Sequence, residues 1–208
     1  MVPRLLAISS PDVRPGPAWR QWCSDLEAAG VDGLQVRRKD ASDRDLIELA
    51  CEARAHTTGA VTILVNARLD IALAARADGV HLPASGLPVS RLRAALAACA
   101  APPILFGRST HSLEEVRRAR DEGADFVLFG PVFPTPSKAG RIPVQGLDGL
   151  AHAAACGLPV LALGGIDATN AGQALDCGAW GLAAIRWFAE PAAGGRGFAA
   201  LRRRWQAA

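Results

Sequence analysis

The 208-residue chain has no apolar run of the roughly 18 residues that a membrane-spanning helix needs. It has no C-x-x-C pair among its five dispersed cysteines, and its formal net charge is only +3. The opening MVPRLLAISS enters an apolar segment at once and is broken by Pro11, which is typical of a first strand rather than a signal peptide. These absences predict a cytoplasmic protein with reduced thiols that binds neither a membrane nor nucleic acid.

A recurring pattern organises the chain. Four segments that begin at residues 30, 76, 123 and 178 read GVDGLQV, RADGVHL, GADFVLF and GAWGLAA. Each follows an Ala-rich segment with helical periodicity and leads into a short apolar run of β type. Gly30, Gly123 and Gly178 suit the left-handed position that ends a helix, so each copy predicts a helix followed by a strand.

Further short apolar runs lie between these copies, at about 5–8, 61–65, 104–107 and 159–163. Eight strands that alternate with eight helical segments predict a parallel sheet with right-handed crossovers. Length alone fits one large domain or two small ones. The alternation favours a single-domain (β/α)8 barrel over residues 1–208. An open doubly wound sheet would need a G-x-G-x-x-G turn after the first strand, where the chain reads ISSPD.

In such a barrel the chemistry gathers where the strands end. The second predicted strand continues into Gln35, Arg37 and Lys39, which alternation places on one side, at or above the barrel. Cations in that position are costly unless they meet an anion, so these residues predict an anion site. A salt-bridge cluster with Asp40 and Asp43 on the rim is the structural alternative.

The next three strand ends offer polar side chains. Asn66 follows the third strand, and Ser109 and Thr110 follow the fifth, where all three are candidates for ligand contact. His81 lies within the fourth strand, and we expect a hydrogen-bonded interior residue there rather than a base.

The last three strand ends offer phosphate-binding groups. The loop FGPVFPTPSKAGR, residues 129–141, contains three prolines that stiffen it by fixing φ. Paired glycines follow the seventh strand just before a helix, a favourable place for a phosphate. The candidate residues of these loops are Thr135, Ser137, Lys138, Gly164, Gly165 and Arg186. One anion site lies around Gln35, Arg37, Lys39 and Lys138, and another lies at Gly164 and Gly165. Two anion sites predict two phosphorylated substrates or one substrate with two phosphorylated ends.

The motifs LQVRRKD, LVNARLDIALAARADGVHL, GRSTHSLEE, GADFVLFGPVFPTPSKAG and LALGGIDATNA occur in this order along almost the whole chain. With them the sequence resembles the thiamine phosphate synthases. The resemblance implies a (β/α)8 enzyme of thiamine biosynthesis, a transferase that joins hydroxymethylpyrimidine diphosphate to thiazole phosphate and releases pyrophosphate.

The resemblance also distributes the candidate residues between the two substrates. It implies that the pyrimidine's diphosphate is held by Gln35, Arg37, Lys39, Asn66 and Lys138. It implies that the thiazole phosphate is held by Thr135, Ser137, Gly164 and Gly165, and Arg186 could add a counter-charge. Ser109 and Thr110 would lie near both substrates, and we assign catalytic roles to Lys39, Lys138 and Ser109.

The chain departs from this family at two positions. The family's Asn-Asp-Arg is Asn66-Ala67-Arg68 here, and its Gly-Gln-x-Asp segment reads PASG at residues 83–86. Both carboxylates expected to bind Mg²⁺ are therefore missing, so we predict no metal site while Mg²⁺ stays open as a cofactor. Either the reaction has changed, or an arginine compensates. The candidates are Arg38, Arg108 and Arg141.

Two alternatives remain. The chain also resembles the thiazole tautomerases, isomerases that act on thiazole carboxylate phosphate without a metal. That group has a histidine just after the sixth strand, where this chain has Pro131, so His81 or His111 would have to move the proton. The other alternative is a non-catalytic protein that binds thiazole or thiamine phosphate. The synthase comes first because the expected diphosphate ligands are retained. Its partners would be small phosphorylated pyrimidine and thiazole substrates, and a homodimer stays open.

Overall fold

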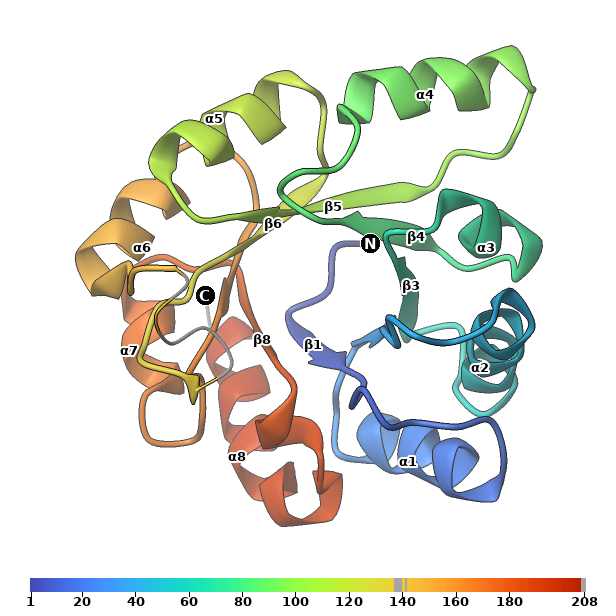
Figure 1. Cartoon of the computed structure of the whole chain (residues 1–208). Coiled ribbons are helices and arrows are strands. Elements are labelled where there is room, and N and C mark those ends of the chain that lie inside the picture. Colours follow the sequence, from blue (N-terminus) through green and yellow to red (C-terminus); the bar gives the residue numbers. More distant parts are fainter. Residues whose placement is uncertain (137–139, 141, 207–208) are drawn as a thin grey trace.

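The computed structural model describes residues 1–136, 140 and 142–206, except for the side chains of 192–196, 202, 204 and 206. Eight parallel strands close into a barrel in which each pairs with its neighbours in sequence order and β8 pairs with β1. The helices lie outside the barrel (Figure 1). The predicted (β/α)8 barrel is thereby confirmed.

The strands are short, and all but two contain four residues. They are β1 (Leu5–Ile8), β2 (Gly33–Val36), β3 (Thr62–Asn66), β4 (Gly79–Leu82), β5 (Leu105–Thr110), β6 (Phe126–Phe129), β7 (Val160–Leu163) and β8 (Gly181–Ala184). The α-helices are α1 (Pro17–Ala28), α2 (Asp43–Ala55), α3 (Leu69–Ala74), α4 (Val89–Ala98), α5 (Leu113–Asp121), α6 (Gly146–Ala154), α7 (Ala171–Asp176) and α8 (Pro191–Gln206). A 3-10 helix, η2 (Arg186–Phe188), precedes α8.

Strand alternation divides the apolar side chains between two clusters. A small cluster that includes Leu6, Leu64, Phe126 and Leu161 fills the barrel interior. The larger cluster lies between the sheet and the surrounding helices and takes the other face of each strand, for example Val65. Because side chains fill the barrel interior, a ligand would bind at the rim.

The repeat seen in the sequence has a structural role at the N-terminal end of the barrel. Its aspartates, Asp32, Asp78 and Asp125, come just before β2, β4 and β6. Each accepts a hydrogen bond from the backbone N–H group at or near the start of the preceding strand, with N–O distances of 2.7, 2.6 and 2.6 Å to Leu5, Ile63 and Phe106. A carboxylate thus joins β1, β3 and β5 to the strand that follows each of them. The fourth copy has Trp180 instead of the aspartate.

The helix ends follow the prediction at three of four copies. Gly30, Gly123 and Gly178 have φ values of 89°, 85° and 88°, the left-handed region in which glycine is unstrained. At the second copy the equivalent position is Arg76, with φ of 50°. This side chain therefore occupies a conformation that disfavours any residue with a Cβ.

The fifth strand is longer than predicted. Instead of ending near Gly107, β5 continues through Ser109 and Thr110, which pair with Leu128 and Phe129 of β6. Arg108, Ser109 and Thr110 are residue types common in loops, so the sequence suggested that the strand ends before them. Their parallel pairing with β6 keeps them in the sheet. Ser109 and Thr110 therefore point to opposite faces.

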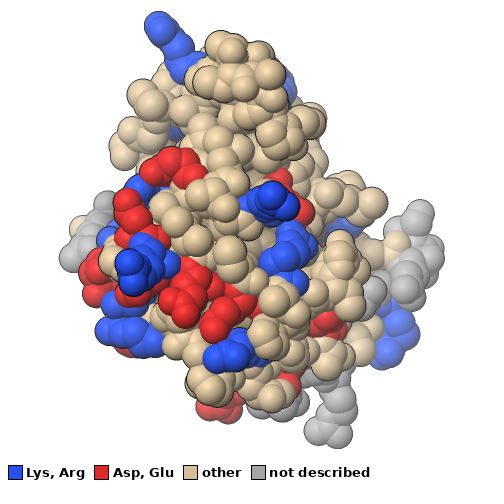
Figure 2. All heavy atoms as spheres, turned by 90° about the vertical axis from the view of Figure 1, so that its right-hand side faces the viewer, with Lys and Arg blue, Asp and Glu red and all other residues tan. Residues whose placement is uncertain are grey.

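Charges of both signs are mixed on the side of the molecule where α2 and α3 lie. Figure 2 shows carboxylates there interleaved with arginine and lysine side chains. Several of these carboxylates form ion pairs, such as Asp43 and Asp70 with Arg68. Within the described part of the chain, no helix is both long and apolar enough to cross a membrane.

Candidate active site

A chain of hydrogen-bonded polar side chains lies inside the mouth of the barrel, at the C-terminal ends of β2 to β5. The Gln35 amide nitrogen donates to Asn66 Oδ1 at 3.0 Å and lies 2.9 Å from His81 Nδ1. On the other side of the ring, His81 Nε2 lies 3.4 Å from Ser109 Oγ. Three predicted site residues are thus brought together, with His81 as the central member.

The partners of His81 define its protonation. The Gln35 amide nitrogen can only donate, so His81 Nδ1 must accept, and the ring proton is on Nε2, where it can be donated to Ser109. Burial, assisted by the nearby charges of Arg37 and Arg108, lowers the pKa of His81 to about 3. The imidazole is therefore neutral at physiological pH.

Sequence reasoning left His81 out of the candidate list because most interior histidines have structural partners. It does have partners, but they are the site residues themselves. The available signal was register: Asn66 of β3 lies opposite His81 of β4, so both side chains face the barrel axis.

Gln35 has an unused acceptor. Its side chain is only 1% exposed, and Oε1 has no hydrogen-bond partner among the described residues. A buried polar atom left without a partner costs about 1–3 kcal/mol. A ligand that donates a hydrogen bond here would recover that free energy.

One cation, Arg37, lies close enough to this network to act on His81, and Lys39 follows two residues later in the chain. Arg37 is half-buried, burial lowers the pKa of its guanidinium, and Lys39 is exposed. No ion pair to either is formed within the described residues; the ion pairs of this rim join Arg38 to Asp40 and Asp45 instead. The rim salt-bridge cluster that we considered, with Arg37 and Lys39 paired to Asp40 and Asp43, is therefore not formed among the described residues, since Asp40 pairs with Arg38 and Asp43 with Arg68.

The loops after β6, β7 and β8 come together on the other side of the mouth. Val132 and Phe133 donate backbone hydrogen bonds to the carbonyls of Leu163 and Gly164, at 2.9 and 3.0 Å. Arg186 Nη2 lies 3.4 Å from Thr135 Oγ1. The structure therefore joins Thr135 and Arg186, which are 51 residues apart in the chain.

The paired glycines are required for this approach. Gly164 and Gly165 have φ values of 95° and 68°, and a Cβ on either would lie 2.7 Å from atoms of Pro131 or Phe133. The glycines thus allow the β6 loop to lie directly against the β7 loop. Ser137 and Lys138, which the sequence predicts as phosphate ligands from the β6 loop, lie outside the described residues.

Thr110 lies apart from the other predicted residues. It is buried, its hydroxyl lies 3.5 Å from the carbonyl of Leu128, and the alternation of β5 turns it away from Ser109. Its position supports a structural role.

A family model described as thiamine monophosphate synthase matches residues 5–188. The chain belongs to this family. The thiamine-phosphate synthase of Methanocella arvoryzae is 43% identical over 160 residues, which are 76% of this chain and 74% of the relative. A protein of Aquifex aeolicus named putative thiamine-phosphate synthase 2 is 38% identical over 191 residues, covering 91% of this chain and 99% of the relative.

A solved member of the family has the same architecture. The thiamine phosphate pyrophosphorylase of Pyrococcus furiosus superposes with a TM-score of 0.78 at 32% identity, covering 96% of this chain and 94% of that one. The superposition with 3-hexulose-6-phosphate synthase, with a TM-score of 0.71 and 17% identity, shows only that the barrel is shared.

Thiamine-phosphate synthases typically use Mg²⁺, but the residues present here do not fit it. Where the family is expected to place its two carboxylates, Ala67, Pro83 and Gly86 line an apolar groove of about 470 Å³ with Leu69, Leu82 and Leu87. Asp70 also borders this groove, but its carboxylate is paired with Arg68. In the described part of the chain, no group of three or more His, Cys, Asp or Glu residues could hold a metal ion.

The arginines that we considered as replacements for the metal charge are used elsewhere. Arg38 pairs with Asp40 and Asp45, as described above. Arg108 is buried and donates to the carbonyls of Ala84, Gly86 and Leu87. Arg141 lies outside the described residues. Arg37 is thus the remaining arginine beside the polar network.

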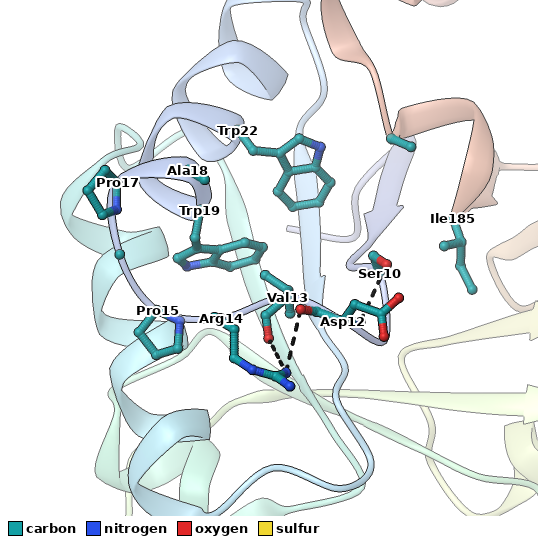
Figure 3. Close-up of a pocket in the computed structure, with 12 residues that line it drawn as sticks. Ser10, Asp12, Val13, Arg14, Pro15, Pro17, Ala18, Trp19, Trp22 and Ile185 are labelled. Atoms are coloured by element: carbon teal, nitrogen blue, oxygen red, sulfur yellow. Dashed lines mark hydrogen bonds between the residues drawn. The ribbon is translucent and has the colours of Figure 1, made fainter.

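An apolar recess of about 480 Å³ adjoins the mouth between β1 and β8 (Figure 3). Val13, Pro15, Trp22 and Ile185 are among its lining residues, and Arg14 turns back to hydrogen-bond carbonyls of its own loop. None of the predicted site residues lines it. The recess is separate from the polar network and from the Thr135–Arg186 contact.

Proposed function

We propose that this family member joins an aminopyrimidine diphosphate to a thiazole phosphate and releases pyrophosphate. The observation that carries the proposal is the unused, buried Oε1 of Gln35 in a neutral hydrogen-bonded network beside Arg37. An exocyclic amino group on a flat ring is a donor that satisfies this acceptor. An aminopyrimidine carries such a group, and its diphosphate would meet Arg37 and Lys39.

This pose changes the role that the sequence suggested for Gln35. Its side chain is buried below the cations, so it suits the ring better than the diphosphate. The diphosphate is left to Arg37, Lys39 and Asn66, with Lys138 as a further predicted ligand. The thiazole phosphate is assigned to Thr135, Gly164, Gly165 and Arg186, with Ser137 as a further predicted ligand.

The reaction needs charge stabilisation more than a base. The bond between the pyrimidine's methylene carbon and the diphosphate oxygen breaks, and pyrophosphate leaves with the electron pair. The thiazole nitrogen then donates its lone pair to the carbon. Cations around the pyrophosphate lower the activation free energy for its departure. A thiazole held by its phosphate supplies the nucleophile at high effective concentration.

The neutral state of His81 agrees with this chemistry. Positive charge develops on the pyrimidine as pyrophosphate leaves, and a protonated imidazole beneath the ring would oppose it. With a pKa of about 3, His81 does not carry that charge. It orients Gln35 and Ser109 instead.

Product formation from the two substrates tests the proposal, measured with Mg²⁺ and with EDTA. Lys39→Ala should lose most of the turnover, while Arg44→Ala, at an exposed position of α2, should keep it. Turnover that survives EDTA and is lost in the lysine variant would support a synthase that relies on its own cations. Absence of pyrophosphate release under either condition would overturn the proposal.

The missing carboxylates favour a second candidate, isomerisation of thiazole carboxylate phosphate by proton transfer. His81 is poorly suited to it because an imidazole with a pKa of about 3 takes up no proton near neutral pH. His111 contacts the carbonyl of Gly130 through Nδ1. Deuterium incorporation into the thiazole from D2O, without any pyrimidine substrate, would select this candidate.

A further inference from the structure

Two loops form the part of the rim where the carboxylates of a metal site would be expected. They are the β3–α3 segment, residues 67–68, and the β4–α4 segment, residues 83–88. Here each segment is held by a guanidinium group. Arg68 forms two-pronged contacts with both Asp43 and Asp70, with N–O distances from 2.5 to 3.1 Å. Arg108 donates to three carbonyls of the β4–α4 segment, those of Leu87, Gly86 and Ala84, at 2.6, 2.9 and 3.1 Å.

The two arginines differ in environment. Arg68 is partly exposed, and the carboxylates that it joins belong to the first turns of α2 and α3. Arg108 is 7% exposed, and its three bonds are all to backbone oxygens. A buried guanidinium surrounded by carbonyl oxygens resembles a cation in its coordination shell, because oxygen lone pairs converge on a positive charge.

The space between the two segments agrees with this arrangement. Ala67, Leu82 and Leu87 face the apolar groove described above. A divalent cation would have to lose its hydration there without carboxylates to replace the water. The two segments therefore line an apolar groove rather than a cluster of carboxylates.

We propose that Arg68 and Arg108 organise the β3–α3 and β4–α4 segments in place of a divalent cation, so that this half of the rim is formed without metal. Arg108 is the more important of the two because it is buried and forms all three of its bonds to one segment. It is a positioning residue: its neighbour Ser109 contacts His81, so a displaced β4–α4 segment would disturb the polar network.

Amide hydrogen exchange of the 83–88 segment tests the proposal without requiring turnover. In the unmodified protein, exchange should be the same in millimolar Mg²⁺ and in EDTA. Arg108→Lys keeps the charge but cannot reach three carbonyls, so exchange in this segment should rise by roughly tenfold, and Mg²⁺ should not reverse the rise. Arg91→Ala, on the exposed face of α4, is the matched control and should leave the segment unchanged.

Two results would overturn the proposal. One is metal binding to the unmodified protein, seen either as slower exchange of the segment when Mg²⁺ is added or as stoichiometric binding of Mn²⁺ alone by electron paramagnetic resonance. The other is an Arg108→Lys variant whose exchange matches that of Arg91→Ala. Neither depends on the reaction catalysed, so a failed synthase assay would leave this inference intact.

Discussion

Replacement of Arg37 by alanine should weaken ligand binding while leaving the fold as stable as before or slightly more stable. The guanidinium is half-buried and forms no ion pair within the described residues, so the folded state desolvates it without a compensating carboxylate. Removing this charge should therefore leave the free energy of unfolding unchanged or raise it, because function rather than stability favours such a residue. A residue that served the fold would behave in the opposite way.

The binding loss follows from charge-assisted hydrogen bonds. Two bonds from Arg37 to phosphate oxygens contribute about 1.5 kcal/mol each, so the variant should lose about 3 kcal/mol. This corresponds to a roughly 150-fold rise in the Kd for pyrophosphate, measured by isothermal titration calorimetry. Because Arg37 also lowers the pKa of His81, the pKa of that histidine should rise in the variant, measured by NMR.

Arg44→Ala is the matched control, since Arg44 is an exposed arginine on the neighbouring α2. It should change neither the Kd for pyrophosphate nor the free energy of unfolding by more than about 0.5 kcal/mol. An Arg37→Ala protein that unfolds more easily by over 1 kcal/mol, and still binds pyrophosphate like the unmodified chain, would refute the reasoning.

Three further predictions concern stability. His81 takes up its proton near pH 6.5 in the unfolded state and near pH 3 in the folded state. Between these values, this residue should therefore lower the free energy of unfolding by about 1.4 kcal/mol for each unit by which the pH falls. In His81→Gln, denaturant titrations from pH 6.5 to 4.5 should show a slope smaller by one proton; an unchanged slope would contradict the burial argument. Arg76→Gly should raise the free energy of unfolding by about 1 kcal/mol because φ is 50° there, whereas Ala75→Gly, where φ is −85°, should lower it. Asp78→Ala should lower it by about 2–3 kcal/mol, because the Ile63 amide and Arg54 lose their partner, while Asp12→Ala at an exposed position should stay within about 0.5 kcal/mol.

The barrel could be predicted from the sequence because its signal is periodic. Apolar runs, helical segments and the left-handed glycines recur at regular intervals, and each copy supports the others. The end of β5 was less predictable, since it depends on pairing with β6 rather than on the residues GRST themselves. The aspartates of the repeat were visible as a pattern, but their bonds to the preceding strands are contacts that only the closed barrel creates.

The candidate site was predictable in its location and less so in its detail. Strand order placed Gln35, Asn66 and Ser109 on one rim, and they do lie together. Burial decided the rest: Gln35 is inside the mouth, Thr110 faces away, and Arg108 is used for three carbonyls. The sequence alone does not show which arginine is paired, because Arg37 and Arg38 are adjacent in the loop after β2 and only Arg38 reaches Asp40 and Asp45.

The carboxylate bonds at the base of the barrel have a consequence for dividing the chain. Asp78 completes the pair β3–β4 and Asp125 completes β5–β6, so no such bond crosses the connection between α4 and β5. The connection between α4 and β5 can be followed in Figure 1. Its Pro102 and Pro103 are exposed. A protein expressed as two polypeptides separated there would give two half-barrels, each with its own aspartate-joined strand pair already complete. Their association would then have to restore the β4–β5 and β8–β1 edges, the bonds of Arg108 to the β4–α4 segment and the Arg93–Asp125 ion pair, so these contacts would report correct reassembly of a protein split at this junction.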